Sequence, residues 1–501
     1  MENPKLSDAK LFTVKDFSSL WEERLYNYTY NPLPSNPNKP FTLVMPSTNQ
    51  APTLQREFLL YTPCEGVSYI GTVAQTMGYD VELIDLRMDG TLETAAQRVA
   101  ERGGVLAMPT FVDSIPQNME LLELVRKKNK DVVIILGGAL VSSLPEPICE
   151  ALEVDFAILQ EGEITLVELL EFLDSGGKKE NSVHIMGLAI KMNDGRIVKT
   201  LPRPQIKTLD SVPIPNLFLY PSIKINPYIP EMGLTTARGC YGRCTFCFVN
   251  IPKMRFKSVK RVDEEIADLV KNYKTEYLYI NDLTFTADIK RTWHICDVLA
   301  KHGLKWSCST RVEKTDPALL KKMYESGCKE IWYGVESLDQ DILNITQKNQ
   351  TVDQINEAID MTLDAGITVM ANLIVGLPGE TQASLEKMFQ FVEKAPVIPA
   401  SIKFLTPFPG TPIYEEAKRR GIVKNDIEYL ISLADRQVNN VKDEIYNFTE
   451  LTDQELREAF ARLTEIKNRR FEQLRETDHD LKNKLYRTDP QKELLKKVRS
   501  S

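Results

Sequence analysis

Short apolar runs alternate with helical stretches along most of this 501-residue chain. The first series comprises FTLVMP (41–46), VELIDL (81–86), VLAMPTF (105–111), VVIILGG (132–138) and FAILQEG (156–162). Such runs are typical of strands that are buried on both faces of a parallel sheet. The alternation of strand and helix predicts right-handed crossovers, so we expect a doubly wound, Rossmann or flavodoxin-like α/β domain over 41–200. A hairpin with Asp194-Gly195 at its turn is expected to end it, over 187–200.

A second series of apolar runs begins near residue 233. Its expected strands are GLTTA (233–237), YLYIN (277–281), LKWSCST (304–310), EIWYGVE (330–336), TVMANLIVG (368–376) and SIKFLTP (401–407). Six strand–helix units predict a large parallel sheet, which either curves into a partial barrel or lies open. Periodicity alone leaves both arrangements open.

These patterns predict five segments along the chain. We expect an N-terminal extension (1–40), the first α/β domain (41–200), a proline-rich linker (201–231), the second α/β domain (232–425) and a helical C-terminal region (426–501). In the last segment, Leu456, Phe460, Leu463 and Ile466 recur at the spacing of one helical face. Residues 475–501 have few apolar side chains and are expected to form a solvated tail.

Charge and composition narrow the possible classes of function. The chain has 62 basic and 70 acidic residues, a formal net charge of −8, which argues against a nucleic-acid partner. It contains no apolar run long enough to span a bilayer and no signal-peptide pattern, so we expect a cytoplasmic protein without a transmembrane segment. Its eight cysteines are then expected to be thiols or metal ligands rather than disulfides.

Cys240, Cys244 and Cys247 form a C-x3-C-x2-C motif directly after the first strand of the second series. One alternative is an accidental group of thiols in a packed loop, and another is a zinc site. Zinc sites usually need four protein ligands, however, and the other five cysteines are scattered. Three soft thiolates on one loop favour an iron–sulfur cluster with one iron left open to substrate. The carboxyl end of a strand is where α/β domains bind their ligands.

This motif, with Phe246 before the last cysteine, resembles the radical S-adenosylmethionine (SAM) superfamily. In that family the open iron of a [4Fe-4S] cluster binds SAM, whose reductive cleavage gives a radical that removes hydrogen from an unreactive carbon. YGVES (333–337) and NLIVGLPGET (372–381) resemble its fourth- and fifth-strand motifs. The SAM-binding residues that the resemblance implies are Phe246, Arg311, Glu336, Ser337 and Gly376.

Simpler roles for these residues remain open. Arg311 and Glu336 alternatively form an ordinary ion pair. Gly376 and Gly379 alternatively serve only to make a turn with Pro378.

The two α/β domains together resemble cobalamin-binding radical SAM enzymes, and this resemblance implies a flavodoxin-like domain followed by a partial (β/α)6 barrel. VLAMPTFVDSI (105–115), LGGALVSSLPE (136–146) and DFAILQEGEITLVELL (155–170) carry this resemblance. The residues that it places near cobalamin are Thr110, Ser114, Gly137, Gly138, Glu161 and Gly162. No D-x-H-x-x-G motif occurs, so the resemblance implies either cobalamin without a lower histidine ligand or a domain that has lost the cofactor.

The alternatives here are local. Glu161 and Glu163 can simply cap the following helix or favour its dipole, and the hydroxyls of Thr110 and Ser114 can bond their own backbone.

The resemblance implies [4Fe-4S], SAM and cobalamin as cofactors, and a methyltransferase that moves a methyl group from SAM through methylcobalamin to an unactivated carbon. One alternative is an oxidoreductase or cyclase with the same cofactors, whose product gains no CH2 unit. Another is a non-catalytic metal-binding protein. A small-molecule, lipid or peptide substrate and an electron donor of the flavodoxin or ferredoxin type are expected. The sequence assigns no catalytic residue and leaves the substrate and the oligomeric state open.

Overall fold

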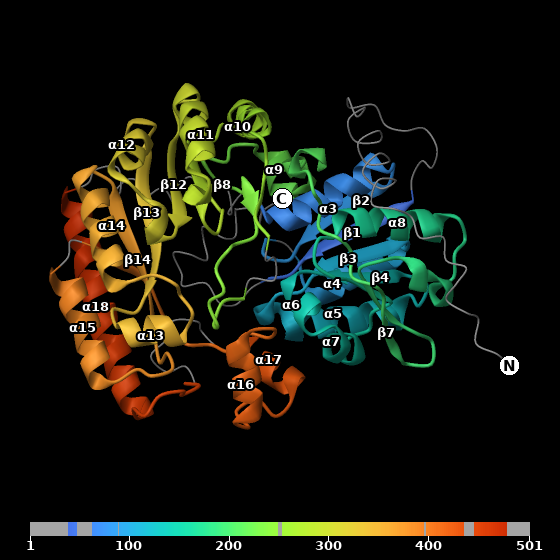
Figure 1. Ribbon diagram of the computed structural model, residues 1–501. Coiled ribbons are helices and arrows are strands. Elements are labelled where there is room, and N and C mark those ends of the chain that lie inside the picture. Colours follow the sequence, from blue (N-terminus) through green and yellow to red (C-terminus); the bar gives the residue numbers. More distant parts are fainter. Residues whose placement is uncertain are drawn as a thin grey trace. The chain divides into compact units, whose positions relative to one another are not determined.

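The computed structural model describes residues 39–47, 63–88, 90–248, 253–394, 397–434 and 445–477. They form two compact units, one with the chain up to Ser47 and Cys64–Pro221, the other with the chain from Ser222 onward (Figure 1). No helix in these ranges is long and apolar enough to cross a membrane. The expected N-terminal extension, apart from its last two residues, and the tail beyond residue 477 lie outside the described residues.

The first unit contains a seven-stranded sheet in the order β2-β1-β3-β4-β5-β6-β7. The parallel strands are β1 (Pro40–Met45), β2 (Asp80–Asp85), β3 (Val105–Pro109), β4 (Val133–Gly137) and β5 (Phe156–Ile158). The antiparallel hairpin is β6 (Leu188–Lys191) and β7 (Ile197–Lys199). The order 2-1-3-4-5 is flavodoxin-like, and such folds bind ligands beyond the carboxyl ends of the strands near β1 and β3. The predicted doubly wound domain and its hairpin are confirmed.

Helices pack on both sides of this sheet. They are α3 (Glu65–Thr76), α4 (Leu92–Arg102), α5 (Ile115–Lys128), α6 (Ala139–Ser143), α7 (Pro145–Ala151) and α8 (Glu163–Asp174). The central strands β3 and β4 are apolar because both faces of the sheet are covered there, and Leu106, Ile134 and Leu136 are completely buried. The helix ends follow local signals, such as the capping box that Thr91 and Thr94 form at the start of α4.

The proline-rich segment 201–231, expected to be a linker, packs in large part within the first unit. Ile206, Leu209 and Val212 form a buried cluster with Tyr69 of α3. The hydroxyl of Tyr220 accepts a hydrogen bond from the Cys64 backbone N–H at 2.8 Å. Apolar residues between the prolines therefore anchor the segment, and the division between the two units follows Pro221, where α9 (Pro221–Ile225) begins.

The second unit contains a six-stranded parallel sheet in the order β15-β14-β13-β12-β11-β8. The strands are β8 (Glu231–Leu234), β11 (Tyr277–Ile280), β12 (Lys305–Thr310), β13 (Cys328–Glu336), β14 (Thr368–Val375) and β15 (Ile398–Phe404). Each pairs in parallel with the next along the chain. Because the order never reverses, this is the arrangement of a barrel and not of a doubly wound sheet. β8 and β15 are its two edges, so the barrel is partial, as predicted.

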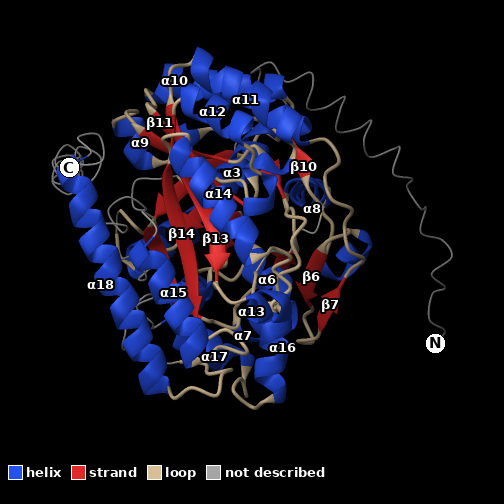
Figure 2. Cartoon of the chain, turned by 60° about the vertical axis from the view of Figure 1, so that its left-hand side comes forward, coloured by secondary structure: helices blue, strands red, loops and turns tan. Residues whose placement is uncertain are grey.

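Most helices of the second unit lie on one face of this sheet, but α16 and α17 lie away from that layer (Figure 1). The helices after α9 follow in chain order. They are α10 (Val259–Tyr273), α11 (Ile289–Lys301), α12 (Pro317–Glu325), α13 (Gln340–Ile345), α14 (Val352–Asp364), α15 (Gln382–Lys394), α16 (Pro412–Arg419), α17 (Asp426–Ala434) and α18 (Asp453–Thr477). α18 lies beside α15 (Figure 2), and its predicted apolar face is buried. Phe460 of α18 stacks on Phe404 of β15, with ring centroids 4.5 Å apart.

Candidate functional site

The loop that carries the three cysteines follows β8, and the short strands β9 (Ala237–Arg238) and β10 (Arg255–Phe256) pair at its base. Asp282, just after β11, fixes the chain before the first cysteine. Its carboxylate accepts hydrogen bonds from the Thr236 N–H and hydroxyl, both at 2.6 Å, and from the Ala237 N–H at 2.8 Å. Arg291 donates to the Thr236 carbonyl at 3.0 Å. The neighbouring strand and helix thus position the cysteine loop.

The sulfurs of Cys240 and Cys244 lie close together around Gly242. A carbon at the Cβ position of Gly242 would lie 3.4 Å from the Cys240 Sγ and 3.8 Å from the Cys244 Sγ. The Gly242 N–H donates to the Cys240 Sγ at 3.3 Å. Cys247 is exposed, and crowding by protein atoms together with these two sulfurs raises the pKa of its thiol to about 11.

This donor set fits a polynuclear cluster better than a single ion. In the described part of the chain, no three His, Cys, Asp or Glu side chains converge as the ligands of one ion must. The cysteines of an iron–sulfur cluster bind different irons, so their sulfurs need only border a common space. Iron coordination also deprotonates a thiol, which offsets the raised pKa of Cys247.

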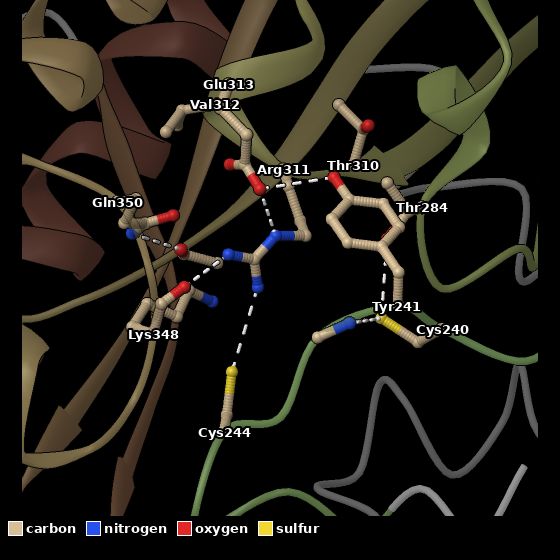
Figure 3. A network of polar contacts seen from close by, with 12 residues as sticks. Cys240, Tyr241, Cys244, Thr284, Thr310, Arg311, Val312, Glu313, Lys348 and Gln350 are labelled. Atoms are coloured by element: carbon tan, nitrogen blue, oxygen red, sulfur yellow. Dashed lines mark hydrogen bonds and ion pairs between the residues drawn. The ribbon is translucent and has the colours of Figure 1, made fainter. Parts of the chain in front are cut away.

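Arg311, directly after β12, connects this loop to the rest of the barrel (Figure 3). Its side chain is buried, its Nη1 lies 3.7 Å from the Cys244 Sγ, and its Nη2 donates to the Lys348 carbonyl. Burial opposes the charge, but the ion pair with Glu313 raises the pKa of Arg311. The Tyr241 hydroxyl donates to the same Glu313 carboxylate at 3.1 Å. A permanent cation is therefore held beside one of the cysteine sulfurs.

Glu336 ends β13 in a strained conformation. Its φ of 63° is left-handed, and the pairing of β13 with β14 shifts register between Gly334 and Glu336. Its carboxylate forms a buried ion pair with the Lys348 Nζ at 2.9 Å. Because Arg311 pairs with Glu313 and Glu336 with Lys348, the alternative in which Arg311 and Glu336 pair with each other is wrong.

The remaining residues of the expected SAM site lie at the same carboxyl edge. Ser337 is buried and accepts a hydrogen bond from the Asp339 N–H at 3.2 Å, whereas Phe246 is half-buried. Gly376 and Gly379 have φ values of 91° and 85°, and the turn with Pro378 is present. That turn requires both glycines whether or not a ligand binds.

Glu380 closes this turn from within the protein. Its Oε2 accepts the Gly376 N–H at 2.6 Å, while its buried Oε1 has no hydrogen-bond partner among the described residues. Burial raises the pKa of this carboxyl to about 8.

In the first unit, the loops after β3 and β4 meet. The Thr110 hydroxyl donates to the Gly137 carbonyl at 2.8 Å and accepts the Val141 N–H at 3.2 Å. Ser114, at the end of the 3-10 turn η2 (Val112–Ser114), exchanges hydrogen bonds with the Phe111 backbone at 3.0 and 3.1 Å. The Ser114 hydroxyl therefore bonds its own local backbone, as the alternative states, whereas the Thr110 hydroxyl joins the loop after β3 to the backbone after β4.

The glycines here leave room beyond the sheet. A carbon at the Cβ position of Gly137 would meet nothing within 4 Å. Gly138 has a φ of 107° and approaches the Thr110 carbonyl oxygen, which would lie 3.2 Å from such a carbon. The backbone after β4 is thus open to a flat ligand, which fits a corrin ring.

Glu161 and Gly162 precede α8. The Glu161 carboxylate accepts the Ile206 N–H at 3.0 Å, so it helps to anchor the proline-rich segment. Gly162 occupies the N-cap of α8, and the buried Glu163 lies in its first turn, where a carboxylate favours the helix dipole.

Sequence reasoning missed the residues that partner the predicted ones. Lys348 lies between α13 and α14, and no pattern in the sequence links it to Glu336. The sequence likewise contains no pattern that links Glu313 or Tyr241 to the site of Arg311. Asp282 could have been predicted as a site residue, because it directly follows an expected parallel strand and therefore lies at the ligand-binding edge of the sheet.

Two family models match parts of this chain. The B12 binding domain matches residues 56–170, and the radical SAM superfamily matches residues 234–392. An uncharacterized methyltransferase of Pyrococcus horikoshii is 29% identical over 384 residues, which cover 75% of this chain and 82% of that protein. The anaerobic magnesium-protoporphyrin IX monomethyl ester cyclase of Rubrivivax gelatinosus is 26% identical over 371 residues, covering 71% of this chain and 66% of that enzyme.

A solved structure shares the fold. It is the radical SAM methyltransferase TsrM of Kitasatospora setae, bound to tryptophan and a SAM analogue, with a TM-score of 0.61 and 18% identity. The match covers 76% of each chain.

Proposed function

We propose that this chain, which matches the radical SAM superfamily and the B12 binding domain, is a cobalamin-dependent methyltransferase acting on an unactivated substrate carbon. The observation that carries the proposal is the three-cysteine loop, backed by Arg311, in a chain whose other unit matches the B12 binding domain. The name of the Pyrococcus relative, a methyltransferase, points the same way. When bound, the cofactors would supply the radical chemistry and the methyl group.

We assign the second-unit residues as follows. Cys240, Cys244 and Cys247 hold the cluster, and the Arg311 guanidinium beside Cys244 stabilises its negative charge. Phe246, Arg311, Glu336, Ser337 and Gly376 surround SAM. The Glu336 carboxylate, held by its ion pair with Lys348, is proposed to accept hydrogen bonds from SAM.

In the first unit, Thr110, Ser114, Gly137, Gly138, Glu161 and Gly162 are proposed to border cobalamin. The open backbone at Gly137 supports contact with the ring. Thr110, Ser114 and Glu161 support that surface indirectly, since each bonds backbone of the surrounding loops. The substrate is proposed to be a small molecule, lipid or peptide, and the electron donor a flavodoxin or ferredoxin.

The test is anaerobic purification with added cobalamin, followed by iron and cobalt analysis and a visible spectrum. The proposal expects a brown protein with about four irons and one cobalt per chain. Methyl transfer is then tested with methyl-labelled SAM and candidate acceptors, whose product must gain one CH2 unit. Iron without cobalt would overturn the cobalamin-dependent reaction, and zinc alone would favour the non-catalytic metal-binding alternative.

The relative from Rubrivivax supports a second candidate, an oxidative cyclase that uses the same cofactors. The two candidates differ in mass balance. A cyclase product loses hydrogen and gains no labelled methyl group, whereas a methyltransferase product gains the label.

A further inference from the structure

One face of β13, β14 and β15 keeps partly or fully exposed side chains in the described part of the chain, although Met370 and Ile398 on it are buried against Trp332. On these strands the buried Tyr333, Leu373 and Ile402 alternate with residues that remain partly or fully exposed. Tyr333 bonds Thr362 of α14, so the buried set faces the helices. The exposed set, here called the open face, comprises Trp332, Gly334, Asn372, Ile374, Ser401 and Lys403.

Strand register places Lys403 on the open face beside the Glu336–Lys348 pair. Gly334 pairs with Asn372, Asn372 with Ser401, and Ile374 with Lys403. Paired residues of parallel strands point to the same side. A carbon at the Cβ position of Gly334 would lie 2.5 Å from the Glu336 Oε1 and 2.6 Å from the Lys348 Nζ. The ion pair therefore folds back over the open face.

Lys403 carries the uncompensated charge of this surface. Glu336 is already paired with Lys348, and Arg311 with Glu313. Among the described residues, the Lys403 ammonium has neither an ion pair nor a hydrogen bond. The open face thus presents a free cation, although the chain as a whole has a net charge of −8.

The surroundings of this ammonium are unfavourable to a lone charge. The side chain reaches solvent through the open face, yet the protein around it lowers the pKa of Lys403, against the opposing effect of Glu336. Lys467 of α18 is a second cation nearby, because burial and then Lys403 lower its pKa. Like charges repel each other, and an anionic ligand beside Lys403 would offset its repulsion from Lys467.

We propose that Lys403 binds an anionic group, a carboxylate or a phosphate, of a ligand on the open face. The inference rests on the proposed function, which provides two sources for such a group: the carboxylate of SAM and an acidic group of the methyl acceptor. An acceptor source would restrict the substrate class to acids. Both sources present the same chemistry to Lys403, so the experiment has to separate them.

The test is acylation of lysines in the anaerobically reconstituted full chain, read by mass spectrometry of its peptides. Inorganic phosphate is the anionic probe, with sodium chloride at equal ionic strength as its control. We expect phosphate at about four times its dissociation constant to slow acylation of Lys403 about fivefold. Lys424, an exposed lysine of the same unit, is the matched internal control and should be unaffected.

SAM and its decarboxylated form separate the two sources. Protection by SAM, but not by the decarboxylated form, assigns the group to the carboxylate of SAM. Protection by phosphate, with neither form of SAM effective, assigns it to the acceptor. Equal acylation of Lys403 under all conditions would overturn the proposal.

Variants supply a second readout. Phosphate should raise the midpoint of thermal unfolding of the wild type and of Lys403→Arg, but not that of Lys403→Met. The Met variant should itself fold normally, because it removes an unpaired charge. A chain that binds neither iron nor cobalt defeats the proposed function, whereas phosphate protection of Lys403 can still be measured in that protein, so the two failures are distinguishable.

Discussion

Three different segments bring hydrogen-bond donors to the sulfurs of the cysteine loop. The Gly242 N–H comes from the loop itself, the Thr284 hydroxyl follows β11, and the Arg311 guanidinium follows β12. Hydrogen bonds and positive charge near cluster sulfurs stabilise the reduced, more negative state. The residues that fix the loop are therefore also expected to tune how easily a bound cluster is reduced.

The Thr284 hydroxyl lies 3.6 Å from the Cys240 Sγ and 2.8 Å from the Leu283 carbonyl oxygen, and its single hydrogen can point to only one of them at a time. Once Cys240 is deprotonated by a cluster, the hydroxyl is the only possible donor of the pair. Thr284→Val removes the donor but keeps the shape of the side chain. A hydrogen bond worth about 1 kcal/mol corresponds to about 40 mV for one electron, so the midpoint potential should fall by up to this amount. Potentiometric titration followed by electron paramagnetic resonance measures it. Thr284→Ser should retain the wild-type value, and an unchanged potential in the Val variant would rule out the hydroxyl as a donor to sulfur.

Glu380 predicts a pH-dependent stability. Burial raises the pKa of this carboxyl from 4.5 to about 8, so between these values the unfolded chain releases a proton that the folded chain retains. Its contribution is fully present below pH 4.5 and is lost as the pH rises toward 8. Glu380→Gln still accepts the Gly376 N–H but cannot ionise. Relative to wild type, its free energy of unfolding should rise by about 3 kcal/mol between pH 5.5 and 8.

Urea unfolding of both proteins across this pH range is the measurement. Parallel curves for Glu380→Gln and the wild type would show that the Glu380 carboxyl has an ordinary pKa in the folded chain.

Only some residues of the candidate site could be predicted from the sequence. Cys240, Cys244 and Cys247 could be predicted as a group because their spacing is local. Arg311 and Glu336 could be named only through a family resemblance. Their actual partners, Glu313 and Lys348, follow from tertiary contacts that leave no periodic signal.

At the scale of elements, the partial barrel has an edge strand, β15, that is covered by a helix. β15 is that edge, and α18 packs against it through Phe460, which stacks on Phe404. Arg462 then lies over the Phe389 ring of α15, 3.9 Å from its centroid. α18 is thus fastened both to the edge strand and to the helix beside it.

Phe460→Ala should loosen this edge. The ring is 2% exposed, and truncation of a buried Phe costs about 3–5 kcal/mol. We expect faster backbone hydrogen exchange in β15 and α18, with no change in the strands of the first unit. Glu465→Ala, an exposed position on the same helix, is the control. Unchanged exchange in β15 would mean that α18 does not hold the edge strand.

Apolar runs predicted every strand of both main sheets but not where each strand ends. The first strand of the second series was expected to reach residue 237, whereas β8 ends at Leu234. The cause is Asp282, whose carboxylate takes the N–H groups of Thr236 and Ala237. A side chain from the loop after β11 thus replaces sheet pairing, and the strand propensity of residues 235–237 does not encode that competition.

At the scale of the whole molecule, the described residues form two compact units, one with a mostly parallel sheet and one with a fully parallel sheet. The alternating pattern predicted both, but it left open whether the second sheet is doubly wound or a barrel. The observed strand order is that of a barrel. Strand order depends on which strands pair in space, and the composition of a single strand does not determine it. The proline count likewise marked 201–231 without showing that Ile206 and Leu209 bury themselves in the first unit.

Two separately packed units predict two independently loaded cofactor sites. The triple variant Cys240→Ala, Cys244→Ala and Cys247→Ala should lose its iron and keep its cobalt after anaerobic reconstitution. Gly138→Val should do the reverse, since a φ of 107° and the Thr110 carbonyl 3.2 Å from the new carbon strain the loop after β4. Gly66→Ala, where a Cβ meets nothing within 4 Å, is the control for Gly138→Val and should keep both metals.

The measurement is the iron and cobalt content of each purified variant. If either variant lost both metals, loading of one unit would depend on the other, and the two sites would have to be treated as one cooperative assembly.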